Sequence, residues 1–146
     1  MNFSLRVTFL DGMCAEAVSY YSDTFGINPE EYFTFGDKHD MLGNVPEEKS
    51  HYIYHAMLSI PGNPGLRLVL GDSPVLLFQD KPAEIIAISQ HTTVEITDTD
   101  PAVIRKIYDG LMRKGKANQE LGETPQYKLF GSLIDKYGVL WNLNCV

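Results

Sequence analysis

The chain has 146 residues, a length typical of one compact domain that buries its own hydrophobic core. Hydrophobic residues make up 44% of it and charged residues 21%, as in ordinary soluble globular proteins. The net charge of -7, from 19 acidic and 12 basic residues, disfavours binding to nucleic acids or to anionic membranes, because both require a basic surface.

The two cysteines, Cys14 and Cys145, form no CxxC pair and have no metal-finger spacing. We expect reduced thiols, as in the cytosol. The sequence shows no basic-then-apolar signal at its start and no apolar run long enough to span a bilayer. We therefore expect a cytoplasmic protein.

The first elements are a strand and a helix. Residues Phe3–Phe9 alternate apolar and polar side chains, which predicts a strand with one packed face. A helix follows, and it should end at Gly26. Its apolar stripe is formed by Cys14, Ala17, Val18, Tyr21 and Phe25. A short strand is expected at about Tyr32–Phe35.

Residues 36–50 form a polar loop that is longer than a hairpin requires. Two strands are predicted after it, at about Tyr52–Ile60 and Leu66–Leu70. The segment Pro61–Gly65 between them has the composition of a hairpin turn. Residues 73–86 are interpreted as a connector.

The second half begins with a predicted strand, Gln90–Ile96. Asp100 followed by Pro101 indicates the start of a helix, which should end at Gly115. Its apolar stripe is formed by Ile104, Ile107, Tyr108 and Leu111. Strands at Gln126–Ile134 and Val139–Cys145 are expected to follow, with a turn at residues 135–138.

The two halves repeat one another. The segment Val7–Asp11 matches Val94–Asp98 in pattern, and Gly65–Leu70 matches Gly138–Leu143. Each half is thus interpreted as a βαβββ module. We predict an α+β fold in which two such modules, about 1–72 and 87–146, form a curved mixed sheet around a cavity within one domain, 1–146.

Three segments carry a resemblance to a known family. They are FLDGMCAEAVSYYSDTFG (Phe9–Gly26), HAMLSI with LRLVLGD (His55–Ile60 and Leu66–Asp72), and FGSLIDKYGVLWNLN (Phe130–Asn144). In this order they resemble the PhnB-like branch of the vicinal-oxygen-chelate superfamily, which includes glyoxalases, bleomycin-resistance proteins and dioxygenases. Lys136 stands where that pattern usually has proline.

The resemblance implies where a metal ion would be bound. In metal-dependent members, each module supplies one ligand from its first strand and one from its last. The repeat places these positions at Ser4, Val69, His91 and Asn142. Only His91 is a strong ligand for a divalent metal, and one histidine does not hold a catalytic ion alone. We therefore expect no cofactor, with a divalent metal disfavoured.

A substitute metal site remains an alternative. His55 and Asp72 flank the first-module hairpin and are the best replacement ligands. His39 and His51, in or beside the polar loop, are weaker candidates, because an exposed histidine is usually only solvated.

Strand alternation predicts a polar pocket. Arg6, His91, Glu95 and Asn142 would face inward and offer a cation, an imidazole, a carboxylate and an amide. Ser4 and His55 complete the predicted ligand-binding set, and His91 is the candidate general acid or base. The alternative is that Arg6 and Glu95 merely pair across neighbouring strands and that His91 is inactive.

Several aromatic side chains have two interpretations. Tyr52, Tyr54, Phe130 and Trp141 are either core residues or pocket walls, and core is the favoured interpretation. By alternation, Trp141 should face away from Asn142.

The functional expectation is a homodimer that binds a small polar molecule without the superfamily's full metal site. Whether it is also an enzyme stays open: the alternative is a metal-dependent or His91-based lyase, isomerase or dioxygenase. A third possibility is an interaction domain whose pocket is filled by core side chains.

Overall fold

The computed structural model describes residues 3–9, 12–63, 65–73 and 93–146. The chain divides into two compact units, Met1–Ile85 and Ile86–Val146, which are described separately below. The predicted connector, apart from Ser73, and the start of the predicted strand Gln90–Ile96 lie outside the described residues.

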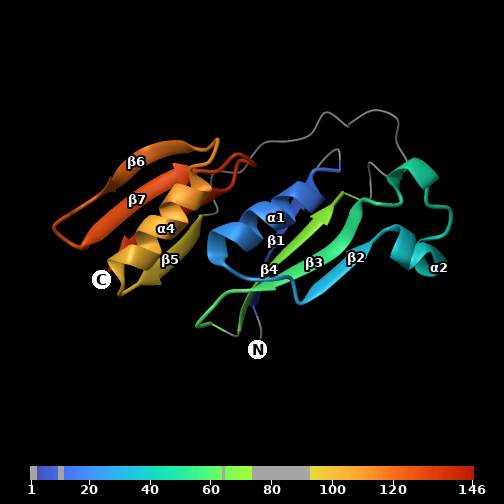
Figure 1. Ribbon diagram of the computed structural model, residues 1–146, viewed down its shortest axis with the longest axis horizontal. Helices are drawn as coiled ribbons and strands as arrows, with labels where there is room; N and C mark the ends of the chain where they lie inside the picture. The colour runs from blue at the N-terminus through green and yellow to red at the C-terminus, as the bar shows by residue number, and fades with distance from the viewer. Residues whose placement is uncertain (1–2, 10–11, 64, 74–92) are drawn as a thin grey trace. The chain divides into compact units, whose positions relative to one another are not determined.

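The first unit contains a four-stranded mixed sheet in the order β1-β4-β3-β2 (Figure 1). Strand β1 is parallel to β4, and the other neighbours are antiparallel. The elements in chain order are β1 (Phe3–Phe9), α1 (Cys14–Phe25), β2 (Glu31–Thr34), η1 (Gly36–Lys38), α2 (His39–Leu42), η2 (Glu47–Lys49), β3 (Ile53–Ser59) and β4 (Leu66–Asp72). The strands and the helix predicted for this half are therefore present, with bounds that differ by one or two residues.

Helix α1 forms where its apolar stripe predicted it and packs against β3 and β4. Cys14, Ala17, Val18 and Tyr21 are buried along it. The helix ends at Gly26, whose φ of 67° is left-handed and therefore suits a residue without a side chain. The predicted stop is confirmed.

A buried carboxylate connects this helix to the sheet. Asp72, only 2% exposed, lies at the end of the central strand β4. Its two oxygens accept hydrogen bonds from the backbone N–H of Cys14, at 3.0 Å, and of Ile53, at 2.8 Å. The carboxylate thus satisfies a free N–H at the start of α1 and another at the start of β3.

The second unit repeats this plan, with the sheet order β5-β8-β7-β6 (Figure 1). Its elements are β5 (Val94–Asp98), α4 (Pro101–Leu111), β6 (Lys116–Gly122), β7 (Leu129–Ile134) and β8 (Leu140–Cys145). Strand β5 is parallel to β8, as β1 is to β4. The predicted α+β fold with two βαβββ modules is confirmed.

Helix α4 begins as predicted, because the Asp100 carboxylate accepts a hydrogen bond from the N–H of Ala102 at 2.8 Å. The predicted end at Gly115 is wrong, since the helix stops at Leu111. Gly115 has a different role: a Cβ there would lie 2.7 Å from the Leu111 carbonyl oxygen and 2.9 Å from that of Ile134. The glycine allows the backbone to pass close to both.

Strand β6 was not located by the sequence pattern. Its seven residues, Lys116–Gly122, are mostly exposed, and its pairing with β7 is irregular. A polar edge strand with bulges carries no clear period-two signal. The following strand is also shorter than predicted, beginning at Leu129 instead of Gln126.

Trp141 is a core residue, as favoured from the sequence, and is 1% exposed. Its indole Nε1–H donates to Asp135 Oδ2 at 2.9 Å. The other oxygen of Asp135 accepts from the N–H groups of Tyr137 and Val139. The buried Asp135 therefore ties the β7–β8 turn to the core of the second unit.

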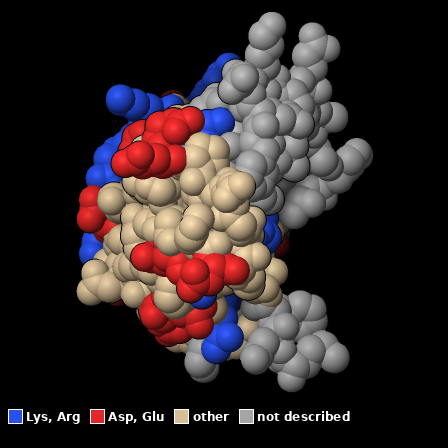
Figure 2. Space-filling model, turned by 90° about the vertical axis from the view of Figure 1, so that its right-hand side faces the viewer, with Lys and Arg blue, Asp and Glu red and all other residues tan. Residues whose placement is uncertain are grey.

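The surface agrees with the acidic composition. Figure 2 shows acidic groups distributed around a patch of uncharged side chains on one face. No helix in the described part of the chain is both long and apolar enough to cross a membrane.

The role of Asp72 gives a first prediction. Asp72→Asn should lower the free energy of unfolding by about 1–3 kcal/mol, because an amide has one acceptor oxygen for two buried N–H donors. Urea unfolding followed by far-UV circular dichroism measures this. The control, Asp40→Asn, changes an exposed carboxylate and should stay within about 0.5 kcal/mol. Equal stability of the two variants would show that the Asp72 hydrogen bonds do not anchor α1.

Candidate functional site

Each sheet has one face covered by its helix and an opposite face, which we call the polar face. On the first sheet, Ser4, Arg6 and Thr8 of β1 are exposed, whereas Phe9 on the helix side is buried. Arg6 lies opposite Val69 in the strand register, and Thr8 lies opposite Gly71. The alternation predicted for this strand is confirmed.

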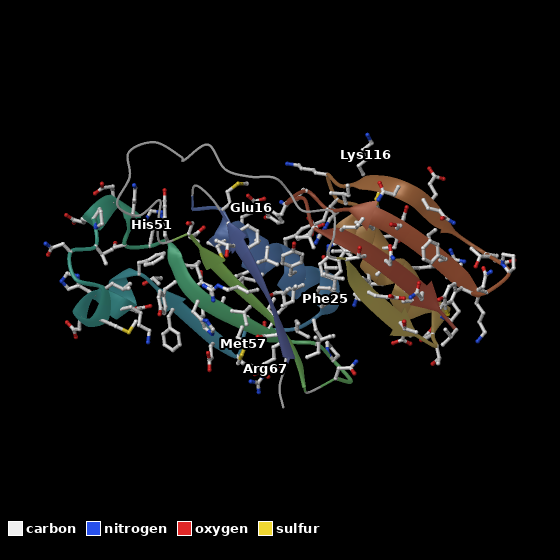
Figure 3. All side chains as sticks on the ribbon, turned by 180° about the vertical axis from the view of Figure 1, so that it is seen from behind. Glu16, Phe25, His51, Met57, Arg67 and Lys116 are labelled. Atoms are coloured by element: carbon white, nitrogen blue, oxygen red, sulfur yellow. The ribbon has the colours of Figure 1, made fainter. Side chains whose placement is uncertain are left out.

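Strands β3 and β4 add further groups to the polar face of the first sheet. Met57 lies opposite Val69, and Ser59 lies opposite Arg67. Met57 and Arg67 are thus diagonal neighbours, and Figure 3 shows their side chains at the same end of the sheet. Arg67 is half-buried, and its Nε has no hydrogen-bond partner. This face therefore carries two arginines, Arg6 and Arg67, on either side of the apolar residues Val69 and Met57.

His55, one of the predicted ligand-binding residues, is in an ion-pair geometry. Its Nε2 lies 2.8 Å from Glu31 Oε2 on the edge strand β2. Nearby on β2, Phe33 has the Lys38 ammonium 4.1 Å from its ring centroid. The imidazole of His55 is thus held by a carboxylate that sequence reasoning had not identified.

The polar face of the second sheet carries a cluster of polar side chains. Glu95 and Thr97 are exposed on β5, and Asn142 is half-buried on β8 opposite Glu95. The neighbouring Asn144 is 1% exposed. Its Nδ2 donates to Glu95 Oε1 and, at 3.3 Å, to Thr97 Oγ1. Its Oδ1 is buried without a partner.

The strand register corrects the internal alignment made from the sequence. The N–H of Ser73 donates to the Phe9 carbonyl, and the N–H of Val146 donates to the Asp98 carbonyl, so Phe9 and Asp98 are equivalent. The equivalent of Ser4 is then Thr93. The proposed equivalence of Ser4 and His91 is wrong by two residues.

The error has a simple cause. A shift of two residues preserves the alternation of a strand, so periodicity does not detect it. The match of Asp11 with Asp98 by residue type favoured the wrong register. The equivalence of Val69 and Asn142 stands, because these residues lie opposite Arg6 and Glu95, which are themselves equivalent.

The predicted pocket residues fall on different sheets. Arg6, Ser4 and His55 belong to the first sheet, and Glu95 and Asn142 belong to the second. Within either sheet, Arg6 and Glu95 are not on neighbouring strands, and the alternative that they pair stays a prediction. His91, the candidate catalytic residue, lies outside the described residues.

The described positions do not fit the metal site that the resemblance implies. Ser4 and Asn142 offer only neutral oxygen donors, and Val69 offers none. Within the described residues, no three His, Cys, Asp or Glu side chains lie close enough together to hold a metal ion.

The substitute ligands do not fit such a site either. Both oxygens of Asp72 accept backbone hydrogen bonds, and His55 is paired with Glu31. His39 and His51 are exposed, and the ring of His51 packs edge-on against Tyr52. Burial raises the pKa of Asp72, while its backbone hydrogen bonds and the charge of His51 oppose that rise. Asp72 is a structural residue.

Sequence reasoning missed the buried polar group of the second sheet, Asn144. A signal for it existed, because the match of Gly65–Leu70 with Gly138–Leu143 extends by one residue to Gly71 and Asn144. Glycine and asparagine are dissimilar residues, so the sequence pattern does not mark Asn144 as the equivalent of Gly71.

A surface groove of about 380 Å³ lies on the helix side of the second unit, between α4 and β6. It is lined by Arg105, Tyr108, Asp109, Met112, Glu120 and Leu121. None of the predicted site residues that the structure describes lines it, so this groove is separate from the polar faces.

Comparison with known proteins gives one curated relative and several structural neighbours. No family model matches the chain. Protein YjdN of Escherichia coli is 26% identical over 142 residues, covering 92% of this chain and 89% of YjdN. A Pseudomonas aeruginosa protein of known crystal structure superposes with a TM-score of 0.78 at 25% identity, over 99% of this chain and 97% of its own.

Two further structures identify the fold. A PhnB protein from Bacillus cereus superposes with a TM-score of 0.74 at 20% identity, over 100% of each chain. A glyoxylase/bleomycin resistance protein/dioxygenase domain from a Frankia species has a TM-score of 0.58 at 13% identity, over 99% of this chain and 94% of its own. The fold implied by the sequence resemblance is confirmed.

Neither cysteine should react in the folded protein. Cys14 and Cys145 are free thiols with no exposed area. Burial raises the pKa of the Cys14 thiol strongly; the Asp72 carboxylate raises it further, and Arg6 opposes the rise. Ellman's reagent should therefore label neither cysteine in the native protein and both after denaturation, because a thiolate is the reacting species. Rapid labelling of native Cys14 would contradict this account.

Proposed function

We propose, on the premise that this chain has the PhnB-like glyoxalase fold of the vicinal-oxygen-chelate superfamily, that it binds a small polar molecule without the superfamily's full metal site. The observation that carries the proposal is the combination of residues on the polar faces. Val69 and Asn142 stand at the last-strand metal positions, whereas charged and amide side chains surround them.

The chemistry of these faces supports binding rather than core packing. Arg6, Thr8 and Glu95 are exposed polar groups on sheets whose other faces pack against helices. Arg67 and Asn144 each hold a buried polar atom without a hydrogen-bond partner. Buried polar atoms usually have partners, so a polar ligand or water is expected to supply them. An interaction domain with a filled apolar core would not need these groups.

Metal content is the first measurement. Protein purified without chelators should contain far less than one zinc, nickel, iron or manganese ion per chain by mass spectrometry, because the described ligand positions lack strong donors. Metal present at one ion per chain would contradict the proposal and favour the metal-dependent lyase, isomerase or dioxygenase.

Ligand binding is the second measurement. A thermal-shift screen of small polar molecules should give compounds that raise the melting temperature, because binding to the folded state alone stabilises it. Asn142→Leu should reduce the rise in melting temperature for compounds that bind the polar face of the second sheet. Arg105→Gln on α4 should leave that rise unchanged. The absence of any stabilising compound would count against a binding role.

His91 separates binding from catalysis. His91→Ala should leave ligand binding unchanged if the protein only binds its ligand. A loss of measured turnover with binding retained would favour the enzyme that uses His91 as general acid or base.

Light scattering on a size-exclusion column tests the homodimer that we propose from the resemblance.

A further inference from the structure

The two modules place different residues on equivalent backbone positions of their polar faces. The corrected register makes Arg6 equivalent to Glu95, and Thr8 equivalent to Thr97. The match of the last strands makes Gly71 equivalent to Asn144. The second module therefore shows what lies above this position of the last strand when the residue there has a side chain.

In the second module the place is filled by a planar amide. The Asn144 carboxamide lies between Glu95 and Thr97, and its Nδ2 donates to an oxygen of each. Asn144 is 1% exposed, so the amide is enclosed. In this module the carboxylate of Glu95, on the first strand, accepts a hydrogen bond from the NH2 group of the planar Asn144 amide.

In the first module the Arg6 guanidinium takes this place. Gly71 has no side chain, and a Cβ there would lie 3.0 Å from Arg6 Nη2 and 2.9 Å from the Tyr54 carbonyl oxygen. The Arg6 guanidinium therefore lies directly over the glycine, against the backbone. Thr8 lies beside Gly71 in the register. Glycine at this position on a central strand is explained by the close approach of the arginine.

The first module thus offers hydrogen-bond donors, on Arg6, where the second module offers acceptors, on Glu95. Within the described part of the chain, no hydrogen bond or ion pair joins Arg6 or Thr8 to an acceptor side chain, although the chain has 19 acidic residues. A guanidinium presents parallel N–H groups that match the two oxygens of a carboxylate. A carboxylate is planar like the carboxamide of Asn144 but presents acceptors on both sides.

We propose that Arg6, Thr8 and Gly71, here called the Gly71 site, bind the carboxylate group of a small molecule. The inference rests on the proposed function and names its ligand class. The Arg6 guanidinium holds the two carboxylate oxygens, and the Thr8 hydroxyl donates a further hydrogen bond. The carboxylate lies against the guanidinium that covers Gly71, so the first module binds an acceptor from outside where the second pairs its own Glu95 with Asn144.

The test uses the full chain labelled with nitrogen-15. It is titrated at neutral pH and constant ionic strength with benzoate and, separately, with benzamide, its neutral isostere. Benzoate should shift the amide resonances of Gly71 and Thr8 in a saturable way, and benzamide should not. Arg6→Gln should weaken benzoate binding at least about tenfold, because a charge-assisted bidentate contact is lost. The affinity of Arg6→Lys for benzoate should fall between those of the unmodified protein and Arg6→Gln.

The matched control is Arg105→Gln, which removes the same charge from an exposed position on α4 that belongs to neither polar face. Its effect on benzoate affinity should stay within about twofold, because a single screened surface charge contributes little. An equal loss in both variants would show a general electrostatic effect and overturn the site.

A second variant copies the other module. Gly71→Asn should abolish benzoate binding, because its side chain would displace the Arg6 guanidinium, which lies 3.0 Å from the position of the added Cβ. Circular dichroism checks its folding, and Arg6→Gln decides the question if Gly71→Asn does not fold. Benzoate binding that is unchanged in Arg6→Gln, equal shifts with benzamide, or no saturable binding of benzoate would each overturn the inference. A neutral compound that binds independently of Arg6 would overturn it while leaving the proposed function intact.

Discussion

The first unit depends on the buried carboxylate of Asp72. By accepting N–H groups from Cys14 and Ile53, it fixes the start of α1 and the start of β3 against the end of β4. A charged group this deeply buried is stable only when its hydrogen bonds are made. Because Asp72 follows Gly71 directly, the same anchor holds the backbone over which Arg6 lies. The structural carboxylate and the candidate site thus share one segment of one strand.

Duplication has given this protein two copies of one backbone plan with opposite chemistry on their polar faces. Glu95 and Asn144 in the second copy form a closed cluster, in which the protein supplies both partners. In the first copy the Arg6 guanidinium lies over Gly71, and no acceptor side chain among the described residues pairs with it. A divergence of this kind retains the packing on the helix side, where Leu70 and Leu143 are both fully buried. The fold therefore tolerates large changes on one face without losing its core.

The sequence predicted the fold well because each prediction rested on a strong local rule. Alternation in Phe3–Phe9, the stop at Gly26 and the cap at Asp100 all appear where expected. The polar strand β6 lacked such a rule and was missed. The site was harder to predict: alternation placed Arg6 and Glu95 on the correct faces, but a two-residue register shift is invisible to it. Asn144 was missed because its equivalent is a glycine.

Trp141 is the chain's single tryptophan, and it belongs entirely to the second unit. Its contact with the Asp135 carboxylate makes its emission sensitive to the β7–β8 turn and the core around it. The first unit, by contrast, has no indole and is optically silent at the wavelengths that excite tryptophan selectively. Tryptophan fluorescence consequently reports on the second unit alone, whereas far-UV circular dichroism reports on the helices and strands of both units. Agreement between the two signals on heating would establish that both halves melt as one cooperative body.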